Sequence, residues 1–196
     1  MILLAYDCSG ESLSVALYEN EKKLGELSSD AGARHSNVLV PMIKKLLKKS
    51  RIKLSEIDVL AVGLGPGSFT GLRVGIATAK VLGYVLKKKI VGVSSLEAIA
   101  REALDGRSAR VAVALDARKS KVYGAVYEQH GEKFRTVVKP ALFDAKKFSG
   151  VSAVPKISRI AEGALALARQ KKFIDPFYLE PLYLYPRDCN VTLPKK

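Results

Sequence analysis

Two aspartates stand where strands are expected to end, a position at which acidic side chains can serve in chemistry. Asp7 follows the apolar run at residues 2–6, and Asp116 follows a second apolar run at residues 111–115. Open α/β folds bind ligands at the carboxyl ends of their strands. Two carboxylates facing each other across a cleft could therefore hold Mg²⁺ against phosphate groups. The other interpretation is that each aspartate starts a turn. We favour it, because no Lys or Arg is placed nearby by spacing.

A glycine-rich run at residues 63–75 follows a predicted strand and leads into a predicted helix. It does not match the phosphate loop of nucleoside triphosphatases, which needs a Lys after its second Gly. It does not match the dinucleotide-binding pattern either, because Thr70 stands in place of the third Gly. Two interpretations stay open. The free N–H groups at the start of the helix could bind an anion, or the glycines serve a tight turn that needs positive φ. Under the first, the anion- or nucleotide-contacting residues are Asp7, Gly65, Gly67, Ser68 and Thr70.

The sequence contains few histidines and cysteines, the residues that most often bind metals or form disulfides. The chain has two histidines, His35 and His130, too few for a three-histidine metal site or a metalloprotease motif. We expect His35 at the surface or capping a helix, and His130 exposed in a hairpin turn. The two cysteines, Cys8 and Cys189, are too few for a secreted disulfide scaffold. We therefore expect no metal, no cofactor and a cytoplasmic protein.

The hydrophobic pattern predicts an α/β fold that presents these residues. Alternating or apolar runs predict strands at 2–6, 13–18 and 24–28, which form a three-stranded meander. Further along, we predict helices at 38–47 and 70–86, strands at 59–64 and 90–93, and a helix that starts at Ser94 with Glu97 three residues later. The order strand, crossover helix, strand favours parallel pairing.

An internal repeat predicts two lobes. The segment Ala5-Tyr6-Asp7 with the strand at 15–19 is echoed by Ala114-Leu115-Asp116 with a strand at 124–128, at the same spacing. A boundary near residues 106–108 would separate the copies into a lobe at 1–106 and a smaller lobe at 107–196. After Val138 the second half loses the regular alternation of strands and helices. It contains a predicted helix at 158–170 and an extended, proline-containing tail at 177–187.

Both central helices carry more apolar surface than one sheet can cover. The apolar positions of the helix at 38–47 sweep an arc of roughly 200°, about twice the width that burial against one sheet needs. The helix at 70–86 adds a line of small residues at steps of four, which lets a neighbouring backbone approach closely. The second side must face an internal helix or a partner. We assign the partner interface to Leu39, Ile43, Leu46, Gly71, Gly75, Ala79 and Gly83.

The charge balance favours a polyanionic neighbour. The chain has 33 basic and 19 acidic residues, a formal net charge of +14, and such a surface attracts RNA such as tRNA. Lysines at helix ends also fit solvated faces beside helix C-termini. A plain RNA-binding module is disfavoured, because aromatic residues do not interleave with the basic ones. The opening MILLAYD reads as a strand rather than a signal peptide, and no apolar stretch is long enough to span a bilayer.

Three segments together resemble the TsaB family. They are Asp7-Cys8-Ser9 after the opening strand, a His-Ser pair leading a Leu-rich helix at 35–47, and the string GPGSFTGLRVG at 65–75. The resemblance implies the duplicated actin-like ATPase fold, also called ASKHA and ribonuclease H-like, with two lobes and a reduced second lobe. It also implies a partner, TsaD, which acts with TsaE to transfer a threonylcarbamoyl group to an adenosine of tRNA. Direct contact with tRNA stays open, and a homodimer is an alternative when TsaD is absent.

The same resemblance implies that this subunit is not the catalyst. TsaD-like sequences continue with Val-Asn-His-x-x-x-His, whose histidines bind metal, whereas this chain places Ser95 and Ile99 at the two histidine positions. The alternative is an enzyme, an ATP-dependent kinase or ATPase of the actin-like fold that uses Asp7 and Asp116. It is disfavoured because residues 130–196 contain no second glycine-rich motif for adenosine.

Overall fold

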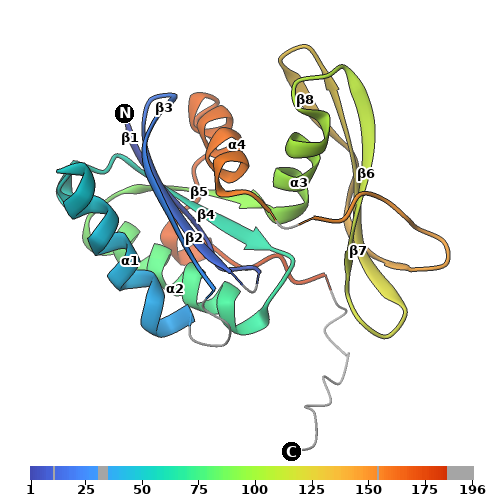
Figure 1. Cartoon of the computed structure of the whole chain (residues 1–196), viewed down its shortest axis with the longest axis horizontal. Coiled ribbons are helices and arrows are strands. Elements are labelled where there is room, and N and C mark those ends of the chain that lie inside the picture. The colour runs from blue at the N-terminus through green and yellow to red at the C-terminus, as the bar shows by residue number, and fades with distance from the viewer. Residues whose placement is uncertain (11, 31–34, 154, 185–196) are drawn as a thin grey trace, which may run out of the picture.

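The computed structural model describes residues 1–10, 12–30, 35–153 and 155–184, which build two β-sheets and four α-helices (Figure 1). The first sheet and its helices comprise β1 (Ile2–Asp7), β2 (Leu13–Glu19), β3 (Lys22–Ser29), α1 (His35–Ser50), the short η1 (Leu54–Glu56), β4 (Val59–Gly65), α2 (Phe69–Val85) and β5 (Lys89–Ser94). The chain continues through α3 (Ser95–Leu104), β6 (Ala109–Asp116), β7 (Lys121–His130), β8 (Lys133–Asp144), α4 (Ile157–Arg169) and η2 (Pro176–Tyr178). No helix in the described ranges is long and apolar enough to cross a membrane.

The first sheet has the strand order β3-β2-β1-β4-β5. Its first three strands form the predicted antiparallel meander, and β1, β4 and β5 pair in parallel through the α1 and α2 crossovers. Because strand side chains alternate, Leu4 and Tyr6 of β1 pack toward α1 and α2, while Leu3 and Ala5 pack toward α4. The sheet is therefore buried on both faces.

The second sheet is a three-stranded antiparallel meander with the order β6-β7-β8. Its resemblance to the first meander is confirmed in topology, with one difference of register. Asp7 lies opposite Ser14, whereas Asp116 lies opposite Val122, so the second hairpin is one residue tighter than the sequence repeat suggests. The described chain adds no crossover strands to this sheet. The predicted α/β fold with a reduced second part is confirmed, because the second sheet has three strands against five in the first.

The two lobes exchange helices across the expected boundary. Residue 106 lies in a tight turn, where both Asp105 and Gly106 have positive φ. However, α3, which precedes this turn, packs on the second sheet through Leu96 and Ile99. The later α4, predicted at 158–170, packs on the first sheet. A division into 1–106 and 107–196 thus follows the sequence repeat but not the packing, because each sheet needs a helix from the other half to cover it.

Candidate partner interface

The predicted anion site lies at one edge of the first sheet, where β1 and β4 end. Asp7 is buried, and its Oδ1 accepts a hydrogen bond of 2.7 Å from the Ser9 N–H. Oδ2 has no hydrogen-bond partner among the described residues. A Cβ at Gly63 would lie 2.5 Å from the Asp7 Cγ, so only glycine fits beside this carboxyl group. Burial raises the pKa of Asp7 above its ordinary value, because a charged carboxylate is poorly solvated there.

The glycine loop contacts the first hairpin loop backbone to backbone. A Cβ at Gly67 would overlap the carbonyl group of Ser9, and one at Gly71 would overlap the carbonyl oxygen of Cys8. The Ser68 N–H donates to the Ser9 carbonyl oxygen at 2.7 Å. The two loops therefore occupy the space between them, which leaves no room there for a phosphate group.

The remaining members of the predicted anion site also serve the turn. Gly65 has a φ of 87°, so it needs the positive φ that glycine tolerates. The Ser68 side chain caps α2 by accepting from the Gly71 N–H at 3.2 Å, and Thr70 is exposed in the first turn of that helix. The geometry thus favours the tight-turn interpretation over the anion site.

Asp116, the other predicted carboxylate, lies in the second sheet. It is exposed, and its Oδ1 accepts a 2.8 Å hydrogen bond from the Arg118 N–H. Asp7 and Asp116 thus make the same bond to the residue two positions later, and each begins a turn, as favoured from the sequence. The described geometry gives no support to joint action of the two carboxylates in a kinase.

His35 and Ser95 strengthen the first hairpin from its two sides. His35, expected at the surface or capping a helix, is not at the surface: it is buried as the first residue of α1, and its Nε2 lies 3.1 Å from the Gly10 carbonyl oxygen. The Ser95 hydroxyl donates to the Ser9 Oγ at 2.9 Å. His130 is exposed, as predicted. The ranges that the structure describes contain no group of three His, Cys, Asp or Glu that could hold a metal ion.

The small residues of α2 face the protein's own sheet, so their assignment to a partner interface is wrong. Gly75 lies against β1, where the Tyr6 hydroxyl donates to its carbonyl oxygen at 3.2 Å and a Cβ would lie 3.4 Å from the Cys8 Sγ. Gly83 lies against Ile90 of β5. The physical reason is that small side chains let the helix backbone approach the sheet closely. The other assigned residues, Leu39, Ile43, Leu46, Gly71 and Ala79, are also buried.

A second apolar side of α2 is exposed, and the sequence-based assignment missed it. Val81 exposes 60% of its surface, and Val40 of the neighbouring α1 exposes 45%. Between the two helices lies a shallow hollow of about 280 Å³, which we call the α1/α2 groove, lined by Val40, Ala77, Thr78, Val81 and Leu82. Ala77, Val81 and Val85 also recur at steps of four. The periodicity therefore contained the signal, on a line two residues away from the glycines.

Charged residues border the groove. On α1, Lys44 and Lys48 follow Val40 at steps of four and are exposed. An apolar centre with a polar, solvent-accessible rim is the usual composition of a protein interface.

The amino-acid sequence is similar to those of several known proteins. A family model described as "TsaD: tRNA N6-adenosine threonylcarbamoyltransferase" matches residues 17–184. The chain is 37% identical over 149 residues to the tRNA threonylcarbamoyladenosine biosynthesis protein TsaB of Escherichia coli, and 31% identical over 140 residues to that of Bacillus subtilis. These matches cover 72% and 70% of this chain but 64% and 60% of the relatives, so the chain spans less than two thirds of their length.

Solved structures match over more of the chain. YeaZ from Pseudomonas aeruginosa superposes with a TM-score of 0.84 at 25% identity, covering 93% of this chain and 99% of that one. A second structure, of an uncharacterised protein with similarity to peptidase YeaZ from Pseudomonas aeruginosa, gives a TM-score of 0.86 at 25% identity, covering 94% and 99%.

Proposed function

Because the chain belongs to the TsaB family, we propose that it is a non-catalytic subunit in the formation of N6-threonylcarbamoyladenosine in tRNA. In this role it binds a TsaD-like catalytic subunit and supports that subunit's activity. TsaE joins the larger complex, and tRNA is the substrate of the whole. The role places the chain in the cytoplasm.

The observation that carries this proposal is the α1/α2 groove. Val40 and Val81 are exposed on two adjacent helices, and no described part of the chain covers them. Burying a Val side chain contributes roughly 1.5–3 kcal/mol relative to leaving it exposed. A partner that lays its own pair of helices over α1 and α2 would complete a four-helix bundle around this groove. Without TsaD, a second copy of the chain could cover the same face.

The non-catalytic part of the proposal rests on the positions where a catalyst would need ligands. Ser95 and Ile99, at the places of the two TsaD histidines, are both buried, and Ser95 is hydrogen-bonded to Ser9. The glycine loop contacts the first hairpin directly, so it does not offer the open phosphate cradle that a kinase needs. The kinase alternative therefore has no observation in its favour.

The test is complementation with matched variants. In a bacterium depleted of its own TsaB, wild-type chain should restore threonylcarbamoyladenosine in bulk tRNA, measured by mass spectrometry of nucleosides. Val81→Glu should fail to restore it while accumulating to the wild-type level, because a carboxylate would be buried in the apolar contact. The matched control is Val137→Glu, which alters another exposed Val, 40% exposed, in the second lobe.

Restoration by Val81→Glu at the wild-type level would refute the assigned interface. Failure of the wild-type chain would refute the proposed role itself.

A further inference from the structure

The flank of α2 opposite α1 is covered by residues 173–184, which we call the strap. At one end, the Ile174 N–H donates to the Ile90 carbonyl oxygen of β5 at 2.9 Å. At the other end, the Leu182 N–H donates to the Leu64 carbonyl oxygen of β4 at 2.8 Å. Between them, Leu179 is buried in the core of the first lobe. The strap is thus bonded to the first sheet at both ends and anchored in its core by Leu179 between them.

Exposed aromatic rings gather where the strap meets α2. Tyr84 and Phe177 form an edge-to-face pair with ring centroids 5.3 Å apart, yet remain 63% and 70% exposed. Toward the other end of α2, Phe69 and Tyr183 lie 5.7 Å apart. The strap therefore adds aromatic residues to a helix face that already carries its own, and each of these rings keeps about half of its surface or more in solvent.

Two basic side chains of α2, Arg73 and Lys80, contact these aromatic residues. The Arg73 guanidinium lies 3.9 Å from the Phe69 ring centroid, and its Nε donates to the Tyr183 hydroxyl at 3.2 Å. The Lys80 Nζ donates to the Phe177 carbonyl oxygen at 3.3 Å. The sequence alone shows no interleaving of basic and aromatic residues. The fold creates it, because residues 69–88 and 175–183 come together only in three dimensions.

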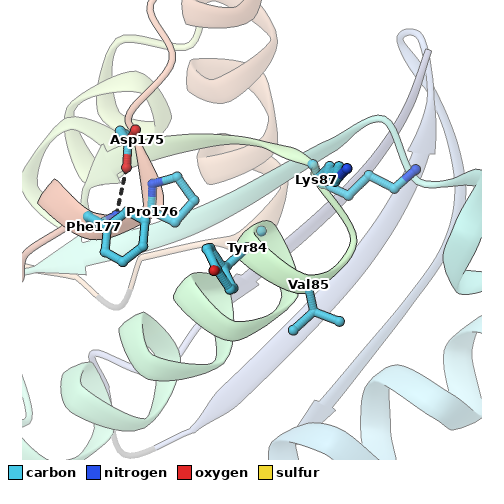
Figure 2. A pocket seen from close by; sticks show the side chains of 8 residues that line it. Tyr84, Val85, Lys87, Asp175, Pro176 and Phe177 are labelled. Carbon is cyan, nitrogen blue, oxygen red and sulfur yellow. Dashed lines mark hydrogen bonds between the residues drawn. The ribbon is translucent and has the colours of Figure 1, made fainter.

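At the end of α2 near Tyr84, the strap and the helix enclose a hollow of about 590 Å³, shown in Figure 2. Figure 2 shows Asp175, Pro176 and Phe177 on one side of Tyr84 and Lys87 on the other. Oδ1 of Asp175, the acidic residue of the lining, accepts from the Phe177 N–H at 2.8 Å. The Lys88 Nζ donates to the Ser55 carbonyl oxygen at 2.7 Å. The hollow is lined by Gly83, Tyr84, Val85, Lys87, Lys88, Asp175, Pro176 and Phe177.

We propose that the strap and α2 bind unpaired nucleotides of RNA, with one base stacked on Phe177 or Tyr84 in this hollow and phosphate groups facing Lys87 and Arg73. Exposed aromatic rings interleaved with cations are the composition of single-strand binding surfaces. The cores of protein interfaces are depleted of lysine, whereas lysines line this hollow. Identifying the RNA as tRNA rests on the proposed function.

The inference is tested by fluorescence anisotropy with a labelled single-stranded oligoadenylate and the full-length chain. Phe177→Leu keeps an apolar side chain but removes the stacking face, and it should weaken binding by about tenfold or more. Phe177→Tyr should bind as the wild type does. Lys87→Glu should weaken binding and flatten its salt dependence, whereas Lys139→Glu, the same charge reversal in the second lobe, should change binding much less.

Two results would overturn the proposal. One is wild-type affinity of Phe177→Leu for the oligonucleotide. The other is loss of affinity of Phe177→Leu for the TsaD-like subunit with RNA binding unchanged, which would make the hollow a protein contact. The readouts separate this inference from the proposed function, because Val81→Glu should lose the TsaD-like subunit and keep the oligonucleotide, whereas Phe177→Leu should do the reverse.

Discussion

The two lobes start from the same unit and use it differently. Each contains a three-stranded meander whose first strand ends in an aspartate, Asp7 or Asp116, that accepts a hydrogen bond from the residue two positions later. In the first lobe Cys8 and Ser9 of this hairpin loop are buried beneath the glycine loop and the start of α2. In the second lobe the corresponding turn is exposed. The difference comes from the β4, α2 and β5 segment, which only the first meander has within the described chain.

This difference shows how the glycine loop serves packing in the first lobe. The segment that brings a glycine loop to the first hairpin also fills the space between them with backbone. What remains accessible on the first lobe is the outer side of the same segment, with the α1/α2 groove on one flank of α2 and the strap on the other. The two surfaces to which we assign function therefore lie on the outside of the first lobe rather than between the lobes.

The largest expected effect tests the contact between α2 and the first hairpin. A single added methyl group in Gly71→Ala would overlap the Cys8 carbonyl oxygen, a backbone atom that cannot move aside easily. We expect the free energy of unfolding to fall by about 1–3 kcal/mol, a typical cost of overpacking. Urea denaturation of the purified chain measures it.

The matched control is Gly75→Ala, four residues along the same line. Its added Cβ would lie 3.4 Å from the Cys8 Sγ, close to an ordinary contact, so the loss of stability should be much smaller. Equal effects of the two substitutions would contradict the close approach at Gly71, and with it the difference between the two hairpins.

A smaller effect is expected in the second lobe, where the charged cluster is at the surface. Glu128 of β7 accepts from the Arg135 Nε at 2.7 Å, with the His130 Nε2 and the Arg110 Nη2 each 3.2 Å from its Oε1. Arg135, His130 and Arg110 lower the pKa of Glu128 from 4.5 to about 2. The carboxylate therefore adds stability above pH 4.5, and this stability is lost as the pH falls toward about 2. Glu128→Gln should be less stable than wild type at neutral pH, with a difference that shrinks across this range.

The two lobes should respond to pH with opposite signs. Burial raises the pKa of Asp7, so its carboxylate costs stability as the pH rises from the ordinary value of 3.8 through the raised one. As the pH rises through the pKa of Asp7, the free energy of unfolding of Asp7→Asn should increase relative to that of the wild type. As the pH rises from about 2 to 4.5, the free energy of unfolding of Glu128→Gln should decrease relative to that of the wild type. Denaturation midpoints that move in the same direction for both variants would contradict the contrast.

Much of the first lobe could be predicted from sequence, because its strands and helices have clear periods and its glycines mark one turn. The meander, the crossover helices and the turn role of Asp7 follow from local patterns. The exposed apolar side of α2 could not be predicted. Gly75 and Ala79 on the inside, and Ala77 and Val81 on the outside, both repeat at steps of four, and helical period alone does not tell which line meets the sheet.

The rest depends on contacts between distant segments. The burial of His35 follows from a hydrogen bond to Gly10 across the first hairpin. The contact of Phe177 with Tyr84 joins residues about ninety positions apart, which no local pattern encodes. The exchange of α3 and α4 between the sheets has the same origin, since each helix packs on a sheet from the other half of the chain.

The central claim is that the first lobe alone presents the partner surface, through the α1/α2 groove. Isothermal titration calorimetry of a TsaD-like subunit into wild type, Val81→Glu and Val137→Glu tests it most directly, with thermal unfolding to verify that all three are folded. We expect Val81→Glu to weaken binding by about a hundredfold or more, because a charge would be buried without a partner. Val137→Glu should bind as the wild type does. Wild-type affinity of a folded Val81→Glu, or an equal loss in both variants, would contradict the claim.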